Sequence, residues 1–398
     1  MYRQFINLMM GGIVNEAFQM TIDTTNAGSA SDTFILSCGN VGVYNAIIDW
    51  GDSTTSDITS WNDVDLTHVY SVGGTYQISI TGDLNWINYK NIGDKLKVIS
   101  IDNWGINQWK SMDQAYLGCT NMYINAVDTP DFSICTSFYR AFMNCPIGSL
   151  VGTENWNMSS AIEIKSIFEN TSITGHLNLS GWDLTSCNLI SNASFPFISN
   201  SNVTSIDFSN WTLRTLGTII TNFISNCDSL TSVTGVNTWL NTNLISSLKT
   251  FINGNALLSS LDLSGMDLSG VTSFVQMFYI NASLSDIDMS NITLNSIGNV
   301  SMQNMFYLNN NGGICNVVGL DTVDITKVNN LSGFLNGTEI TTVEYDKLLI
   351  AWDTLLNVTD GLSAGFGAVK YTGGGAAETS RDNLISTDSW TITDGGSV

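Results

Sequence analysis

The sequence has little positive charge, and this shortage limits what the protein can bind. Its 398 residues include 13 Lys or Arg against 35 Asp or Glu, a formal net charge of −22. Nucleic-acid binding needs clustered cations, so we exclude nucleic acid as a partner. Only 12% of the residues are charged, while 43% are hydrophobic, which is ample for a core. We therefore expect Asn, Ser and Thr to carry the polar surface, as suits a stacked repeat protein better than a cytosolic enzyme.

Catalytic motifs are also scarce. The two histidines, His68 and His176, lie far apart, and we find no Ser/His/Asp set, no metal-ligating pair and no phosphate-binding glycine loop. Some aspartates recur and offer paired carboxylates, but their repeat positions favour solvated ladder faces over a glycosidase pair. These aspartates are Asp183, Asp207, Asp262, Asp267 and Asp288. We therefore predict a protein that is not an enzyme and holds no cofactor.

Cysteine pairing is not indicated by the sequence. There is no CxxC and no Cys/His metal spacing, and an odd count argues against a complete disulfide framework. Cys119 and Cys145 share a repeat phase and can lie one above the other; a disulfide there stays open, although packed thiols are favoured. The seven cysteines are Cys38, Cys119, Cys135, Cys145, Cys187, Cys227 and Cys315.

Long hydrophobic runs are absent, and none reaches transmembrane length. We therefore predict no membrane insertion. Residues 1–15 have a brief apolar run but no convincing cleavage site and no lipobox cysteine, so we do not interpret them as a signal peptide. We interpret them as an N-terminal arm for attachment or oligomerisation, with a frayed end as the alternative.

A repeat of about 26–31 residues per copy fills residues 113–344. In the copy Leu263–Asp288 an alternating apolar run predicts a strand, SGMDLSG predicts turns, and Val271, Phe274, Val275 and Phe278 have helical spacing. Such units must stack, because none can bury its own apolar face. We predict a solenoid with parallel strands on one face and short helices on the other.

Two markers hold the phase of the repeat. The aromatic that closes the predicted helix recurs as Tyr116, Phe142, Phe168, Phe197, Phe223, Phe251, Phe278, Phe306 and Phe334. The residue after the strand recurs as Trp156, Trp182, Trp211, Trp239, Met266, Ile292 and Val323. A small polar residue three or four positions after the aromatic predicts a cap or ladder, as in Cys119, Cys145, Cys227, Asn281 and Asn309.

The N-terminal region has a different pattern. Residues 16–83 contain five short strand-like runs bounded by turn residues, which predicts an antiparallel β-sandwich. Residues 84–112 are rich in aromatics and form the junction, which we interpret as an N-terminal cap of the solenoid. An exposed aromatic patch for glycan stacking is the alternative; the aromatics are Trp86, Tyr89, Trp104 and Trp109.

About 30 residues of the sandwich resemble PKD-type immunoglobulin-like domains. The resemblance is carried by Asp49, Trp50, Gly51, Asp52, His68, Tyr70 and Tyr76, with Ser53 where that family usually has Gly. It implies an immunoglobulin-like fold in which Gly51 and Asp52 turn a hairpin, Tyr70 and Tyr76 pack, and His68 has a structural role. The nearby carboxylates Asp49, Asp52, Asp57, Asp63 and Asp65 offer Ca²⁺ ligands, but without a known loop spacing a solvated turn is favoured.

The repeats resemble BspA-like leucine-rich-repeat surface proteins over most of residues 111–344. The match is carried by Ser180-Gly181-Trp182-Asp183-Leu184, Leu263-Ser264-Gly265-Met266-Asp267-Leu268 and Met277-Phe278. Residues 345–398 resemble the ending of such proteins, in particular Tyr345–Trp352 and Trp390–Gly396. We interpret this tail as a C-terminal cap with helices and a final strand.

Two functions remain open. The PKD-like region, the repeats and the tail together resemble bacteriophage fibre and surface proteins. This implies a virion structural or receptor-binding protein that contacts other virion proteins through its N-terminal region. The alternative is a bacterial cell-surface adhesin of the BspA-like class. In either case we expect a homo-oligomer that recognises a host-surface protein or glycan by an extended face.

Overall fold

The computed structural model contains many more strands than helices. It covers residues 16–214, 218–240, 242–295 and 298–398, so the predicted arm over residues 1–15 lies outside the described residues. Several sheets are parallel, and two α-helices occur in these ranges. The predicted β-rich repeat architecture is therefore confirmed in outline. None of the helices in these ranges is long and apolar enough to cross a membrane.

The chain divides into two compact units. The first runs up to Ala161 and includes Asn170–Ile173, and the second comprises Ile162–Glu169 and Thr174–Val398. The N-terminal β-strands belong to the first unit, whereas most of the repeat and the two α-helices belong to the second.

Antiparallel strands occur in the first unit at all five places where the sequence predicts them. Their inward residues alternate with exposed ones, most clearly in β3, as expected for a sheet with one buried face. A further strand, β4, completes a hairpin with β3 across the turn at Gly51, where φ is +80° and a Cβ would lie 2.4 Å from the Gln77 carbonyl oxygen. The six strands are β1 (Phe18–Asp23), β2 (Thr33–Ile35), β3 (Tyr44–Asp49), β4 (Thr55–Ile58), β5 (Thr67–Val69) and β6 (Thr75–Leu84).

The junction adds a strand to this sheet. Strand β7 (Val98–Asn103) pairs antiparallel with β1 and parallel with β8 (Tyr123–Ile124), which lies in the first part of the repeat. The resulting six-stranded sheet has the order β4-β3-β6-β1-β7-β8, while β2 and β5 pair separately. The first unit also contains the 3-10 helices η1 (Val64–Leu66), η2 (Gly93–Lys97) and η3 (Thr153–Asn155).

Two charged residues of η2 are fully buried. The Asp94 carboxylate accepts hydrogen bonds from the Ser29 N–H at 2.6 Å and the Ser29 hydroxyl at 2.8 Å. The Lys97 ammonium donates to the carbonyls of Ala30 at 2.8 Å and Thr33 at 2.7 Å. Buried charges need such partners, so these bonds fasten η2 to the loop between β1 and β2.

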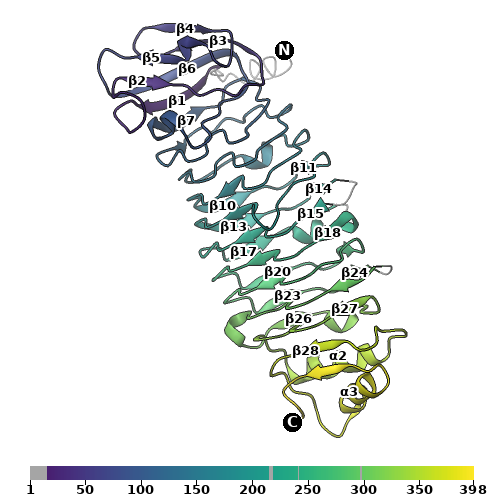
Figure 1. The fold of residues 1–398 in the computed structure, drawn as a ribbon. Coiled ribbons are helices and arrows are strands. Elements are labelled where there is room, and N and C mark those ends of the chain that lie inside the picture. Colours follow the sequence, from purple (N-terminus) through teal and green to yellow (C-terminus); the bar gives the residue numbers. More distant parts are fainter. Residues whose placement is uncertain (1–15, 215–217, 241, 296–297) are drawn as a thin grey trace, which may run out of the picture. The chain divides into compact units, whose positions relative to one another are not determined.

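Parallel strand ladders build the second unit (Figure 1). A coil contributes up to four short strands, and equivalent strands of successive coils pair in parallel. The first ladder is divided into two separate three-stranded sheets, β10-β13-β17 and β20-β23-β26. The second ladder is β9-β12-β16-β19-β22, and shorter ones are β11-β14, β21-β24, β15-β18 and β25-β27. The strands of the first ladder are β10 (Gly175–Asn178), β13 (Val203–Asp207), β17 (Ser232–Thr234), β20 (Ser260–Asp262), β23 (Asp286–Asp288) and β26 (Asn316–Val318).

The remaining strands are only two or three residues long. Those of the second ladder are β9 (Phe168–Glu169), β12 (Ile198–Ser199), β16 (Ile224–Ser225), β19 (Ile252–Asn253) and β22 (Phe278–Tyr279). The others are β11 (Asp183–Leu184), β14 (Thr212–Leu213), β15 (Thr218–Ile219), β18 (Ile245–Ser247), β21 (Asp267–Leu268), β24 (Thr293–Leu294), β25 (Val300–Ser301) and β27 (Val328–Asn330). Four 3-10 helices lie between them: η4 (Val236–Thr238), η5 (Thr242–Leu244), η6 (Asn310–Gly312) and η7 (Leu320–Thr322).

The short helices predicted opposite the sheet are wrong. The segment from Phe274 to Ile280 sends every second N–H to the next coil, including Gln276 to the Gln303 carbonyl at 3.0 Å and Phe278 to Met305 at 2.9 Å. A helix would direct these groups to the residue four positions earlier. Gln276 also has φ of +55°, which no right-handed helix contains. The helical spacing of apolar residues therefore reflects a turn that buries Phe274 and Met277 before the next strand.

The marker residues form columns inside the coils. The nine aromatic markers are at most 1% exposed, and the four tryptophan markers at most 5%. Some successive rings stack, such as Phe223 on Phe251 at a centroid distance of 5.3 Å and Trp211 on Trp239, also at 5.3 Å. Others meet edge to face, as do Phe168 and Phe197, and Phe306 and Phe334. The markers thus have the structural role that the repeat predicts.

The small polar residue after the aromatic forms a buried ladder, as predicted. The Asn255 N–H donates to Asn281 Oδ1 at 3.1 Å, and the Asn281 N–H to Asn309 Oδ1 at 3.2 Å. The Asn281 amide also donates to the Ile252 carbonyl at 3.0 Å, and the Asn309 N–H to the Thr338 hydroxyl at 2.9 Å. Each side chain satisfies backbone groups of the neighbouring coils that would otherwise be buried without a partner.

All seven cysteines are free thiols, in line with the favoured interpretation. In the first unit Cys145 occupies the ladder position, and its thiol donates to the Tyr116 carbonyl at 2.8 Å. Burial raises the pKa of Cys145 to about 12. A thiol with so high a pKa is a structural group rather than a reactive one.

The C-terminal residues form the two predicted helices and the predicted last strand. Helix α2 (Thr342–Asp353) begins with a capping box of Thr341 and Glu344, and Trp352 packs against Phe334, the last aromatic of the column. Helix α3 (Ala376–Ser386) places Arg381 against the buried Asp394, with Nε 2.8 Å from Oδ2. Strands β28 (Ser363–Gly365) and β29 (Thr391–Thr393) pair in parallel.

Candidate functional site

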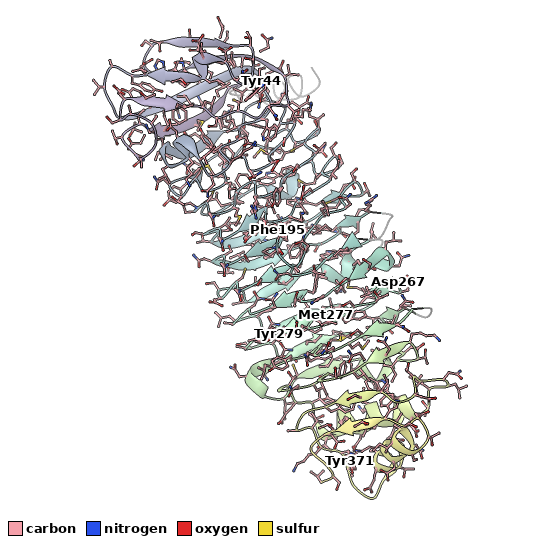
Figure 2. All side chains as sticks on the ribbon, viewed as in Figure 1. Tyr44, Phe195, Asp267, Met277, Tyr279 and Tyr371 are labelled. Carbon is pink, nitrogen blue, oxygen red and sulfur yellow. The ribbon has the colours of Figure 1, made fainter. Side chains whose placement is uncertain are left out.

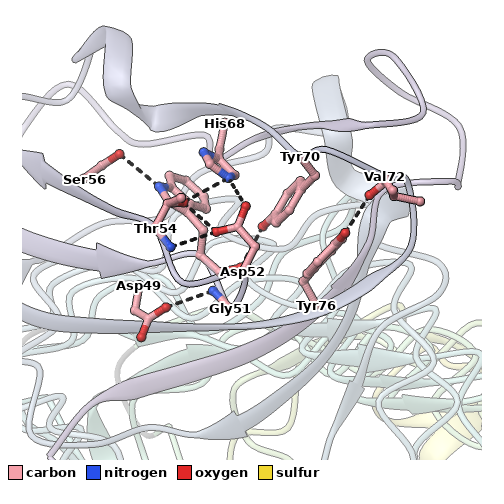
Figure 3. A network of polar contacts seen from close by, with 10 residues as sticks. Asp49, Gly51, Asp52, Thr54, Ser56, His68, Tyr70, Val72 and Tyr76 are labelled. Carbon is pink, nitrogen blue, oxygen red and sulfur yellow. Dashed lines mark hydrogen bonds and ion pairs between the residues drawn. The ribbon is translucent and has the colours of Figure 1, made fainter.

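The residues that resemble a PKD signature form one polar network in the first unit (Figure 3). Asp52 Oδ2 lies 2.8 Å from His68 Nε2, and the Thr54 hydroxyl donates to Asp52 Oδ1 at 2.5 Å. The His68 ring stacks on Trp50 with a centroid distance of 4.8 Å and an interplanar angle of 5°. Tyr70 lies edge-on to His68 at 4.5 Å. The network therefore fixes the turn between β3 and β4.

This network does not have the geometry of a catalytic relay. Thr54 and Asp52 both approach Nε2 of His68, whereas a relay needs the nucleophile and the carboxylate on opposite ring nitrogens. Burial raises the pKa of Asp52, but hydrogen bonds from Thr54 and His68 outweigh it and keep this pKa below its ordinary value. Tyr70 and Tyr76 stack at 3.8 Å. These contacts agree with the structural roles predicted for the signature.

The nearby aspartates act as turn and helix caps. Asp49 Oδ1 accepts from the Gly51 N–H at 2.9 Å, and Asp63 Oδ1 accepts from the Asp65 N–H at 3.3 Å at the start of η1. No group of three or more His, Cys, Asp or Glu in the described ranges is placed to hold a metal ion. The absence of a cofactor stays a prediction.

The four junction aromatics are buried, at 0–6% exposure. Trp109 packs edge-on against Phe18 at 5.1 Å, and Trp104 against Phe132 at 5.9 Å. The alternative of an exposed glycan-stacking patch at the junction is therefore wrong, because no ring face is open to solvent.

The recurrent aspartates of the repeat lie at turns. In each of the five, one carboxylate oxygen accepts the backbone N–H two residues later, as in Asp267 to Ser269 at 3.0 Å. The other four bonds have the same form: Asp183 to Thr185, Asp207 to Ser209, Asp262 to Ser264 and Asp288 to Ser290. Such Asx turns are common local structure and need no ligand to explain them.

Two of these aspartates nevertheless face a groove in the second unit. The groove has a volume of about 390 Å³ and lies over β17, β20, β23 and β26. Its lining combines hydroxyls, amides and carboxylates with a few aliphatic groups: Ser232, Val233, Thr234, Gly235, Asn237, Ser260, Leu261, Asp262, Asp286, Ile287, Asp288, Asn316 and Val318.

Strand register arranges the groove floor in two rows. Ser260, Asp286 and Asn316 are paired across the strands, and Asp262 is likewise paired with Asp288. Successive groups in a row are about 4.8 Å apart, and the two rows are about 6.6 Å apart, because they lie two residues apart on each strand. The intervening residues of the strands point inward and belong to the core.

Side-chain hydrogen bonds, two of them from neighbouring coils, hold these carboxylates in position. Asn237 Nδ2 donates to Asp262 Oδ2 at 2.8 Å, and Asn316 Nδ2 donates to Asp286 Oδ1 at 3.2 Å. The Ser285 hydroxyl donates to the other oxygen of Asp286 at 2.7 Å. Carboxylates have further lone pairs, so Asp262 and Asp286 keep acceptor capacity toward the groove.

A second groove of about 240 Å³ shares Asn316 and Val318 with the first. It extends toward α2, where Glu344 and Lys347 line it. The polar surface thus continues from the strand ladder to the C-terminal helix, and carboxylates outnumber cations along it.

Sequence reasoning found only part of this groove. The repeat pattern marks Asp262 and Asp288, but it does not single out Asn237, Asp286 and Asn316, which also line the groove. Asp286 and Asn316 could have been found from the alternation of polar and apolar residues in β20, β23 and β26, where the residues on either side of the buried one point outward. His176, one of the two histidines of the sequence, lies on β10, and its Nδ1 is 2.8 Å from the Ser205 hydroxyl. It is not among the residues that line the groove.

Comparisons of the chain with protein-family models, with curated proteins and with solved structures gave no match.

Proposed function

We propose that this chain is a non-enzymatic recognition protein of a bacteriophage virion surface, a fibre or receptor-binding component that contacts the host through the groove on its second unit. The virion assignment is supported by the resemblance of the PKD-like region, the leucine-rich-repeat-like coils and the tail to phage surface proteins. Attachment to other virion proteins through the N-terminal region is part of the proposal.

The observation that carries the recognition function is the pair of side-chain rows in the groove. Asp262 and Asp286 are held by amide partners on neighbouring coils, Asn237 in η4 and Asn316 in β26, so binding costs little side-chain ordering. Hydroxyl groups both donate and accept, and they match a surface that offers carboxylates, amides and hydroxyls. With three carboxylates and no cation lining the first groove, an anionic ligand is disfavoured. A neutral or amine-bearing glycan fits best.

Binding of the full chain to arrays of neutral, amine-bearing and acidic glycans tests this function. We expect Asp286→Asn to weaken binding about tenfold, because a charge-assisted bond is worth about 1.5–3 kcal/mol. The matched control is Asp267→Asn, which removes an exposed carboxylate outside the groove and should leave affinity unchanged. Equal losses in both variants, or preferred binding of acidic glycans, would contradict the groove assignment.

Two further measurements test the biological setting. Peptides of this chain should be found by mass spectrometry in purified virions. Incubation with a bound glycan should release no reducing ends. Release of new ends would overturn the non-enzymatic assignment, and recovery of the chain only from cell envelopes, with residues 1–15 removed, would favour the bacterial adhesin.

A further inference from the structure

Each coil has a left-handed backbone residue directly after the last strand or turn of the aromatic column. This residue has φ between +47° and +77° in nine successive coils. Glycine, or asparagine with its short polar side chain, adopts this conformation at least cost, and seven coils use one of them. The seven are Gly118, Asn144, Asn170, Asn200, Asn226, Gly254 and Gly337.

Two adjacent coils break this rule. Ile280 has φ of +55° and Leu308 has φ of +50°. A large side chain is disfavoured there, and a β-branched one such as Ile280 is a genuine outlier. The chain therefore accepts local backbone strain at two neighbouring positions where its other coils avoid it.

The strain brings no core packing to Ile280, whose side chain points to solvent. Ile280 is 41% exposed and Leu308 is 38% exposed, although Leu308 also lies over Gly337. The residues before them are Tyr279 and Tyr307, both partly exposed. The strands of other coils have Glu169, Ser199, Ser225 and Asn253 at this place. From the coil of Glu169 onward, both positions are thus large and apolar only in these two coils, whereas the two earlier coils have Leu117 and Met143 before a glycine or asparagine.

The four side chains form one ridge, which we define as Tyr279, Ile280, Tyr307 and Leu308; Figure 2 labels Tyr279 on the surface of the second unit. The two tyrosine rings stack on each other, with centroids 5.1 Å apart and planes at 16°. The faces between the rings are therefore occupied, and a sugar cannot insert between them. What remains of the ridge is partly exposed aromatic and aliphatic surface, which suits the apolar surface of a protein.

The stretch that contains the ridge has few charged residues, which affects which protein surfaces it can contact. Between Leu268 and Leu320 the only charged residues are Asp286 and Asp288, and both line the groove. Elsewhere the chain carries most of its net charge of −22, so two copies repel each other over most orientations. The ridge belongs to a stretch in which two copies can meet with little repulsion.

We propose that the ridge is a docking surface for a second copy of this chain. The repeat makes the ridge self-complementary, because a two-fold axis between the two coils sets the Tyr279 and Ile280 pair of one copy against the Tyr307 and Leu308 pair of the other. Four side chains cover less than the roughly 800 Å² per partner of a standard interface, so the dimer is weak by itself and gains from attachment of both copies to one particle.

Sedimentation velocity of the full chain across concentrations up to about 1 mM measures this dimer, which we expect to dissociate in the micromolar to millimolar range. The test variant is Ile280→Asn with Leu308→Asn, which restores the residue used by other coils. It should sediment as a monomer and also melt about 2–4 °C higher, because the backbone strain is relieved.

Two controls separate association from folding. Leu356→Asn removes an exposed leucine, 82% accessible, that lies outside the ridge, and it should leave the dimer unchanged. Tyr279→Ser introduces the residue of β12 and β16 and should weaken the dimer without moving the melting temperature upward. A wild-type chain that stays monomeric to about 1 mM, or a double variant that still dimerises, overturns the proposal. Glycan binding by the groove is independent of either outcome.

Discussion

Replacing Lys97 by Met tests how the first unit is held together. The ammonium is fully buried and donates four hydrogen bonds, at 2.7–3.2 Å, to groups of the loop between β1 and β2. Met fills a similar volume but donates nothing. The buried Asp94 carboxylate shares Ser29 as a partner with this ammonium, so it loses its neighbouring cation as well.

The contacts around Lys97 limit how much stability the Lys97→Met change can remove. The Ala30 carbonyl keeps the Thr33 N–H as a donor at 2.9 Å. The single Ser29 hydroxyl proton cannot serve both the Thr33 carbonyl and Asp94, and the Ser29 carbonyl loses the Lys97 ammonium as a donor. The main penalty is therefore the loss of the charged hydrogen bonds to the loop carbonyls, because Asp94 keeps its donors from Ser29 and Ile35. A hydrogen bond to a charged group contributes about 1.5–3 kcal/mol, and we expect Lys97→Met to lower the free energy of unfolding by about this amount.

Urea unfolding followed by tryptophan fluorescence measures the effect, and hydrogen exchange of the Ser29 and Ile35 amides, both bonded to Asp94, locates it. The matched control is Lys110→Met at an exposed lysine, which should stay within about 0.5 kcal/mol of the wild type. The double variant with Asp94→Asn should lose less than the sum of the single changes. A Lys97→Met chain as stable as the control would refute this reasoning.

Three further predictions concern the ladder, acid stability and the thiols. Asn281→Ala leaves the Asn255 N–H and the Ile252 carbonyl without a side-chain partner, and it should cost about 2–4 kcal/mol in urea unfolding; Asn281→Gln at similar cost would show that geometry matters as much as polarity. The lowered pKa of Asp52 contributes stability that is present above its unfolded pKa of about 3.9 and is lost as pH falls through the lower folded pKa, so unfolding curves of wild type and Asp52→Asn should converge toward pH 2 and diverge above pH 4. With its pKa raised to about 12 by burial, Cys145 should react with a thiol reagent at pH 8 only after denaturation, and rapid labelling of the native chain would contradict its burial.

Sequence reasoning predicted the strands and the columns because both depend on local alternation. The burial pattern of β1 and the phase of Phe278 follow from side-chain spacing alone. The helices were predicted wrongly because a turn that buries two residues three positions apart, here Phe274 and Met277, has the same apolar spacing as a helix. A helix and such a turn differ in which carbonyl each backbone N–H group reaches. The apolar spacing in the sequence does not show this.

The groove could not be predicted as a unit. Asp262 and Asn237 lie 25 residues apart, and only the register of neighbouring coils brings their side chains together. The strain at Ile280 was visible in principle, since aligning the coils places it in a column of glycine and asparagine. That the position strains an isoleucine follows only from its left-handed φ value, which the backbone of the structure gives.

Strand β7 belongs to two architectures at once, because it pairs antiparallel with β1 and parallel with β8. The first parallel rung of the chain is thus templated on an edge that the N-terminal sheet already provides. The partner strands β1 and β7 both precede β8 in the sequence, so β8 adds to an edge made only of earlier residues. A fragment that ends at residue 83 would lack β7, so the edge of β1 that pairs with β7 would be exposed. A fragment of the N-terminal sheet should therefore extend beyond β8.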